Sequence, residues 1–363
     1  MIKNLEPLNI GGLELKVPIV QGGMGVKVST ASLASAVADY GGAGTIASVG
    51  LGYGSKENET NFIKASREGF RKEIRQSRDL TEGVVCVNIM VALSNYEDLV
   101  RTAVEENSDV IVSGAGLPLR LPEFAEGSES RLVPIVSSDR AADIIIKSWK
   151  KRYNRLPDAV IVEGPLAGGH LGFKTGDLNP IGKINLEDLV TDVLKVVKGY
   201  EKEFKTDIPV IAAGGIFYGS DIAKFLKLGA RGVQMATRFV TTFECPISDN
   251  VKELYIAAEE KDVVIIESPI GLPGRVIRTK FIDRVEKGET VPIKCQYRCI
   301  RTCDPSNVPY CIAKALFNAV IGDLDNAIVF AGNNVSKVKK IVSVKELMDE
   351  IVAETIEALN KSQ

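Results

Sequence analysis

The chain of 363 residues is long enough for one large domain or two small ones, and 45% hydrophobic with 25% charged residues is typical of a globular enzyme. The formal net charge of −2 gives no electrostatic footprint for nucleic acid. There is no apolar run of about eighteen residues, and the first residues lack a signal-peptide pattern. We therefore expect a cytoplasmic protein that acts on a small molecule, without a nucleic-acid or membrane partner.

The first two thirds of the chain repeat one pattern, in which a short run rich in Val and Ile is followed by a Gly-rich or polar turn and then by an amphipathic helix. The runs are nearly continuous in apolar residues, as expected for strands buried on both faces. Eight strands are predicted, at 17–21, 44–49, 84–90, 109–113, 132–137, 159–163, 209–213 and 232–236.

Helices are predicted between these strands, at 30–40, 96–106, 141–153, 186–200 and 220–228. Ser29 is the expected N-cap of the first helix. The charged helical stretch 56–79 is interpreted as an insertion over the barrel. Strict alternation with eight strands favours a (β/α)₈ TIM barrel of the α/β class, and an open doubly wound sheet is the alternative.

The strand–helix alternation ends near residue 240. A helix after 242–246, a strand at 263–268, a Gly/Pro turn at 272–274 and a helix at 312–320 are predicted next, and a final amphipathic helix at 344–359. We divide the chain into a barrel (1–240), a C-terminal lid or satellite subdomain (241–340) and a helix packing on the barrel (341–363). The C-terminal region is also a candidate interface for a homo-oligomer.

Three glycine-rich stretches follow predicted strands, where the active sites of barrel enzymes are built. They are Gln21-Gly22-Gly23-Met24-Gly25, Ala212-Ala213-Gly214-Gly215-Ile216 and Glu163 to Gly172. Glycines at the ends of strands allow a planar ligand to approach the backbone closely, because they carry no Cβ atom. The loops after strands seven and eight, the latter ending in Gln234-Met235-Ala236-Thr237, are the usual phosphate site of this fold.

The single histidine of the chain, His170, lies in the third glycine-rich stretch. An unperturbed histidine titrates near pH 6.5 and exchanges protons at neutral pH. A lone histidine is more often structural, but its place after a barrel strand makes His170 the candidate catalytic residue.

These motifs in combination resemble the nitronate monooxygenase (2-nitropropane dioxygenase) family, which includes the FMN-dependent enoyl-ACP reductase II enzymes. The resemblance extends over residues 8–245 and rests on Pro18 to Gly25, Val87-Asn88-Ile89-Met90, Glu163 to His170, and the strand-seven and strand-eight loops. It implies bound FMN and a histidine that donates or accepts a proton near the flavin. The cofactor-binding residues that it implies are Gly22, Gly23, Met24, Asn88, Gly169, Ala213, Gly214, Gly215, Gln234, Met235 and Thr237.

Two departures from the family pattern bear on the activity. The enoyl-ACP reductases usually follow Gly-Gly-Met with Ala and a bulky aromatic residue, whereas this chain has Gly25-Val26-Lys27. Many relatives carry a second acidic or polar residue before the paired glycines, where this chain has Leu166-Ala167. The second departure bears on proton transfer, and the first favours oxidation of small anionic nitronates with O₂ over NAD(P)H-dependent reduction of enoyl thioesters or quinones. A phosphate-binding barrel lyase or isomerase without flavin is a third hypothesis.

Four of the six cysteines form the pattern C-x₃-C-x₃-C-x₇-C, at Cys295, Cys299, Cys303 and Cys311. On a helix the first three would share one face, and Asp304-Pro305 would turn the chain back to Cys311. Four thiolates in that arrangement suit an iron–sulfur cluster or a tetrahedral zinc, and an iron centre would suggest an electron-transfer module. The alternative is a set of packed, reduced thiols.

Overall fold

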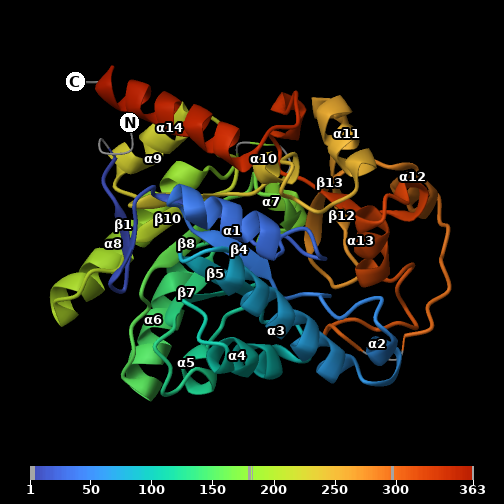
Figure 1. Cartoon of the computed structure of the whole chain (residues 1–363), viewed down its shortest axis with the longest axis horizontal. Coiled ribbons are helices and arrows are strands. Elements are labelled where there is room, and N and C mark those ends of the chain that lie inside the picture. The colour runs from blue at the N-terminus through green and yellow to red at the C-terminus, as the bar shows by residue number, and fades with distance from the viewer. Residues whose placement is uncertain (1–4, 179–180, 182, 296–297, 362–363) are drawn as a thin grey trace.

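The computed structural model describes residues 5–178, 181, 183–295 and 298–361 and shows a parallel β-barrel surrounded by helices (Figure 1). All eight predicted strands are confirmed, each within three residues of its expected bounds. They are β3 (Ile19–Gln21), β4 (Gly44–Ala47), β5 (Val85–Met90), β6 (Val110–Gly114), β7 (Arg131–Val136), β8 (Val160–Glu163), β10 (Val210–Ala213) and β11 (Gly232–Met235).

The strands follow the order β3-β11-β10-β8-β7-β6-β5-β4, and hydrogen bonds close the ring between β3 and β4. Gln21 N donates to Ala43 O at 2.8 Å, and Ala43 N donates to Ile19 O at 3.0 Å. The barrel prediction is therefore confirmed, and the open doubly wound alternative is wrong.

The interior of the barrel is sealed at its amino end by a hairpin of β1 (Leu8–Ile10) and β2 (Leu13–Leu15). Leu8, Ile10 and Leu15 are at most 2% exposed and pack against inward-facing residues such as Val112 and Ile161. Because this end is filled with apolar side chains, ligand-sized space is left at the carboxyl ends of the strands.

The outer layer consists of long helices that follow the barrel strands, with α14 (Val344–Asn360) lying along α9 and α1. The other long helices are α1 (Ala31–Tyr40), α3 (Phe62–Leu80), α4 (Tyr96–Glu105), α6 (Asp139–Tyr153), α8 (Leu186–Phe204) and α9 (Gly219–Leu228). The short ones are α2 (Lys56–Thr60), α5 (Leu121–Phe124), α7 (Thr175–Leu178) and α10 (Thr237–Val240).

Two local predictions in this region are wrong. The segment 56–79 is not an insertion, because α3 packs between α1 and α4 as a regular member of the outer layer. Ser29 is not the cap of α1, which begins after Thr30. The Ser29 hydroxyl instead accepts hydrogen bonds from Met24 N and Gln21 Nε2, both at 2.8 Å, and so fixes the turn after β3.

A second, antiparallel sheet lies beside the barrel. It contains β12 (Val263–Glu267), β13 (Pro273–Ile277) and β14 (Val329–Phe330), and the two-residue strand β9 (Gly169–His170) pairs with β13. The predicted turn at 272–274 is wrong, because Pro273 and Gly274 belong to β13. Gly274 allows the close packing, since a Cβ there would lie 3.2 Å from the Phe330 ring.

The remaining C-terminal elements surround this sheet (Figure 1). They are α11 (Asp249–Ala257), α12 (Lys280–Glu286), α13 (Ile312–Val320) and the 3₁₀ turns η2 (Glu260–Asp262), η3 (Leu324–Asn326) and η4 (Val335–Lys337). Among the described residues, no helix combines the length and the apolar character needed to span a bilayer.

The contact between α1 and β4 gives a test of the barrel packing. A Cβ on Gly44 would lie 1.8 Å from the Ala34 carbonyl oxygen, whereas a Cβ on Gly199 in α8 would meet no atom within 4 Å. We expect Gly44→Ala to lower the free energy of unfolding by about 1–3 kcal/mol or more and Gly199→Ala to raise it by up to about 1 kcal/mol. Equal effects in chemical denaturation would contradict this packing.

Candidate active site

A pocket of about 870 Å³ lies at the carboxyl ends of the barrel strands, beneath α13 and the second sheet. This volume is near the upper end of the range for ligand pockets. All twelve residues that the sequence assigns to catalysis or cofactor binding line it: His170 together with Gly22, Gly23, Met24, Asn88, Gly169, Ala213, Gly214, Gly215, Gln234, Met235 and Thr237.

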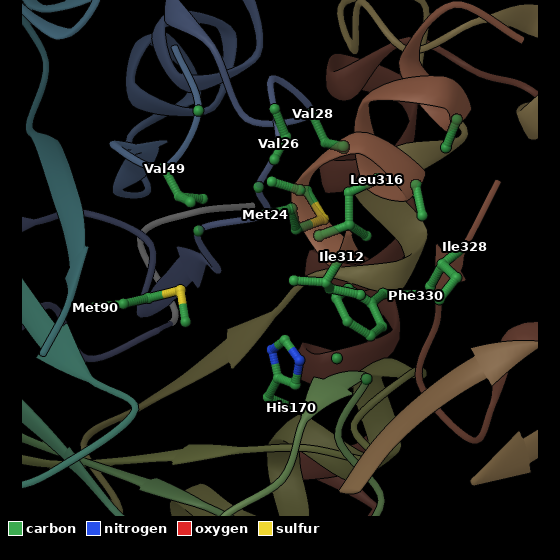
Figure 2. Close-up of a pocket in the computed structure, with 18 of the residues that line it drawn as sticks. Met24, Val26, Val28, Val49, Met90, His170, Ile312, Leu316, Ile328 and Phe330 are labelled. Carbon is green, nitrogen blue, oxygen red and sulfur yellow. The ribbon is translucent and has the colours of Figure 1, made fainter. Parts of the chain in front are cut away.

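His170 projects into this pocket from β9 (Figure 2). Its Nε2 atom lies 2.8 Å from Ser268 Oγ, and its ring meets the Phe330 ring edge-on at 4.9 Å between centroids. Burial lowers the pKa of His170 to about 4. Because this value lies well below the pH 6.5 of an unperturbed imidazole, the ring is an uncharged proton acceptor at neutral pH.

A buried arginine, Arg275, holds the backbone of the His170 loop. It is 2% exposed, and its Nη1 donates to Pro165 O at 2.6 Å and to Ala167 O at 2.5 Å. Burial lowers its pKa to about 10, so it remains a cation at neutral pH. Arg275 and Ser268 were not predicted from the sequence, because their partners lie about a hundred residues earlier in the chain.

Glu163, the last residue of β8, adds a carboxyl group to the pocket wall. Burial raises the pKa of this carboxyl to about 7, and among the described residues no hydrogen bond or charged partner acts on the carboxyl. A buried carboxyl that titrates near neutrality in a cleft is a candidate functional group. Glu163 was not predicted as a site residue. The sequence feature that could have identified it is an acidic residue at the end of a continuously apolar strand.

The loops after β10 and β11 form a glycine-lined corner of the pocket. Gly214 and Gly215 have φ angles of +93° and +83°, in the left-handed region that favours glycine, and a backbone without Cβ atoms lets a ligand approach closely. Opposite them, Gly332 N donates to Thr237 Oγ1 at 3.0 Å, and Asn334 Nδ2 donates to Gly215 O at 2.6 Å. Gly332 and Asn334 come from the C-terminal region and were not predicted from the sequence.

The turn after β3 provides a second glycine-lined wall. A Cβ on Gly23 would lie 2.4 Å from the Cβ of Asn88, and one on Gly22 would lie 3.4 Å from the Gln234 side chain. Gly22 N donates to Met235 O at 2.8 Å. These contacts bring β3, β5 and β11 together at one backbone surface that a planar ligand can approach.

The cysteine motif does not form the predicted helix. The described residues between 295 and 303 are irregular, and the strap they form is joined to the loop after β5: Ser94 N donates to Cys299 O at 3.1 Å, and Arg301 N donates to Ala92 O at 3.0 Å. All four thiols are free, and burial raises the pKa of Cys299 to about 12.

Cys295, Cys299 and Cys311 line the pocket. Among the described residues, however, no group of three or more Cys, His, Asp or Glu is arranged to hold a metal ion. This finding gives no support to the predicted iron–sulfur or zinc site at Cys295, Cys299, Cys303 and Cys311.

The fold and the pocket are those of a (β/α)₈-barrel enzyme, with its site at the face where such enzymes bind their ligands. A model of the nitronate monooxygenase family matches residues 7–354, and the chain therefore belongs to that family of oxidoreductases.

Among curated relatives, the chain is 30% identical over 275 residues to a (3aS,4S,5R,7aS)-5-hydroxy-7a-methyl-1-oxo-octahydro-1H-indene-4-carboxyl-CoA dehydrogenase of Mycobacterium tuberculosis. The match covers 75% of this chain and 66% of that protein, so it spans slightly less than two thirds of the relative. A probable nitronate monooxygenase of Staphylococcus aureus is 25% identical over 304 residues, covering 76% of this chain and 79% of the relative.

Solved structures show the same fold. FabK from Thermotoga maritima superimposes with a TM-score of 0.74 at 29% identity, covering 96% of this chain and 95% of that one. A nitroalkane oxidase from Streptomyces ansochromogenes gives a TM-score of 0.73 at 21% identity, with 96% and 98% covered.

Because His170 is buried, we expect it to titrate well below the pH of a solvated histidine. Because the chain contains one histidine, NMR of protein labelled in histidine reports this ring alone. We expect its signals to stay constant from pH 8 to pH 5.5 and to shift only as the pH approaches about 4. A midpoint near pH 6.5 would show that the ring is solvated and would contradict the buried geometry.

Proposed function

We propose that the protein is an FMN-dependent oxidoreductase that oxidises small anionic nitronates with O₂. The observation that carries the proposal is the placement of the uncharged His170 in one pocket with the Gly214–Gly215 corner. Family membership supports it independently.

The pocket residues fit FMN by their chemistry. The Gly214 and Gly215 amides and the Thr237 hydroxyl are hydrogen-bond donors suited to a phosphate, and the backbone surface of Gly22 and Gly23 suits a flat ring system. Asn88, whose side chain lies against Gly23, can bond to polar edges of the ring or to the ribityl chain. When bound, FMN would supply the electron-transfer chemistry that amino-acid side chains lack.

The side chains around the proposed substrate position would bind the substrate and accept or donate a proton. The hydrogen bond with Ser268 fixes the orientation of the His170 ring, so that the neutral imidazole can accept a proton or donate a hydrogen bond to a nitronate oxygen. Phe330, Met24 and Ile312 surround this position with apolar surface (Figure 2). Low polarity strengthens hydrogen bonds to an anionic substrate.

An NAD(P)H-dependent FMN reductase acting on enoyl thioesters or quinones is the second candidate. It is favoured by the Mycobacterium tuberculosis relative, whose name specifies a CoA thioester. Anaerobic addition of NADH to the FMN-loaded protein separates the two activities, because rapid bleaching of the flavin supports the reductase.

The proposed function is tested with purified protein loaded with FMN and preformed alkyl nitronates. We expect a flavin spectrum near 450 nm, O₂ consumption and nitrite release. His170→Ala should retain FMN, because the proposed phosphate contacts lie on other loops, and should lower kcat by about a hundredfold. A protein that binds no FMN, or that loads with FMN but releases no nitrite, would overturn the proposal, whereas full activity in His170→Ala would overturn the role of the histidine alone.

The raised pKa of Glu163 predicts that kcat/KM depends on pH near neutrality. Its pKa is raised to about 7, so the carboxyl is neutral below this pH and becomes an anion above it. A second anion in the pocket repels an anionic substrate, and we expect kcat/KM to fall about tenfold between pH 6 and pH 8, or roughly 1.4 kcal/mol. The pKa values of Cys299 and Tyr310 lie well above this range and that of His170 lies below it.

The matched variant is Glu163→Gln, which keeps the shape of the side chain and cannot ionise. Its kcat/KM should show no inflection near pH 7. If the inflection persists in this variant, Glu163 is not its origin.

A further inference from the structure

Ser268 and His170 share one hydrogen bond, and the direction of this bond bears on the chemistry of the ring. Ser268 Oγ lies 2.8 Å from His170 Nε2, and Ser268 is 5% exposed. Within the described part of the chain, the Ser268 hydroxyl forms no second hydrogen bond. Whether the hydroxyl or the ring donates in this pair decides which nitrogen of the neutral ring carries the proton.

The environment of Ser268 favours the serine as the donor. A neutral imidazole has one N–H group and one nitrogen that only accepts. If Nε2 carried the hydrogen, the buried Ser268 hydroxyl would have no acceptor among the described residues, and an unpaired buried donor is costly. If Ser268 donates to Nε2, its hydrogen is bonded and only lone pairs of its oxygen stay free. This difference favours the form of His170 that carries its proton on Nδ1.

The Nδ1 atom of His170 is the nitrogen that a ligand can reach. It makes no hydrogen bond with a described residue, and it is not among the buried polar atoms that lack a partner. Nδ1 is therefore accessible, and the space into which the ring projects is the pocket (Figure 2). With Nε2 bonded to Ser268, a ligand in this space meets the N–H group of the ring and no lone pair.

The surroundings of the His170 ring do not suit a general base. A histidine that takes a proton becomes a cation, and a buried cation needs an anionic partner. Burial alone lowers the pKa of His170 to about 4, and no charged group of the described residues acts on the ring. Burial alone also sets the pKa of Glu163, in the wall of the same pocket. A catalytic base works best with a pKa near the working pH, and His170 lies well below neutrality.

An N–H group that faces the pocket suits one of the two forms in which a nitro compound can arrive. A nitronate has already lost the proton next to its nitro group and carries negative charge on the nitro oxygens, which accept hydrogen bonds. A neutral nitroalkane has to lose a proton from carbon before it is oxidised, and this step requires a proton acceptor. The Nδ1–H group of His170 stabilises the nitronate and cannot take the proton of the nitroalkane.

We propose that Ser268 is a positioning residue that holds His170 in the Nδ1–H form, so that the ring donates a hydrogen bond to a nitronate oxygen and takes no proton from carbon. The hydrogen stays on Nδ1 throughout. The protein then oxidises substrates that arrive as nitronates and discriminates against neutral nitroalkanes. The choice of substrate rests on the proposed function, whereas the protonation of the ring does not depend on it.

NMR of the purified protein labelled with nitrogen-15 in histidine tests the protonation of the ring directly. Protonated and unprotonated ring nitrogens differ widely in chemical shift, and the spectra are recorded near neutral pH with FMN and without it. We expect the Nδ1–H form to exceed the Nε2–H form at least fivefold, which corresponds to one net hydrogen bond of about 1 kcal/mol. An unprotonated Nδ1, or an equal mixture of the two forms, would overturn the proposal.

Two variants connect the protonation of the ring with Ser268. In Ser268→Ala the donor is lost, and the ratio of the Nδ1–H form to the Nε2–H form should fall at least fivefold. The matched control is Thr302→Val, which removes a hydroxyl that donates to Ile270 O at 3.0 Å, two residues after Ser268. In this control the ratio should stay at the wild-type value. A wild-type ratio in Ser268→Ala would show that another group fixes the ring.

Kinetics of the FMN-loaded protein test the consequence for the substrate. The two compounds are propane-2-nitronate and freshly dissolved, neutral 2-nitropropane. We expect wild-type kcat/KM to be at least a hundredfold higher for the nitronate, because general base catalysis is absent. This preference should fall at least fivefold in Ser268→Ala and stay unchanged in Thr302→Val. Equal wild-type values for the two compounds, or an equal loss with both in Ser268→Ala, would overturn the positioning role.

The two measurements separate failure of this inference from failure of the proposed function. If no nitronate is oxidised but the ring carries its proton on Nδ1 and loses this preference in Ser268→Ala, the proposed function fails and the role of Ser268 stands. If nitronates are oxidised and Nδ1 is unprotonated, the role of Ser268 alone fails.

Discussion

Two backbone pairs join the barrel to the second sheet, Gly274 with His170 and Arg275 with Gly169. The arrangement of the site depends on this short pairing of β9 with β13. It brings the Ser268 hydroxyl to His170, places the Arg275 guanidinium under the preceding loop and sets the Phe330 ring against the imidazole. The glycine-rich loop after β8 has few side chains of its own to hold it, so its conformation is maintained by the C-terminal region.

The pocket has little charge at its centre for a site expected to bind an anion. His170 is neutral over the physiological range, Cys299 stays protonated, and Glu163 changes its charge near pH 7. The buried cation of Arg275 is turned toward the carbonyls of Pro165 and Ala167. Selectivity in such a pocket comes from hydrogen-bond complementarity, because an unpaired polar group costs most where water is excluded.

The barrel could be predicted from sequence because its strands are buried on both faces and so have continuous apolar sequences, most of them followed by glycine at the functional end. His170, Gly214 and Gly215 were identified from the loops that follow such strands, whereas Asn88 and the full set of cofactor-binding residues were implied by the family resemblance. Ser268, Arg275 and Gly332 carry no such signal, since their roles arise from contacts with residues about a hundred positions away. Ser29 was misassigned for a related reason: its hydroxyl bonds to the preceding turn instead of the following helix.

The hairpin of β1 and β2 has a consequence for how molecules reach the site. By filling the amino end of the barrel with Leu8, Ile10 and Leu15, it closes that end of the barrel to ligands. A ligand of the pocket therefore approaches from the carboxyl ends of the strands, where residues of the C-terminal region form part of the lining. Substitutions in the C-terminal region are then expected to change how fast molecules enter and leave the pocket as well as how they bind.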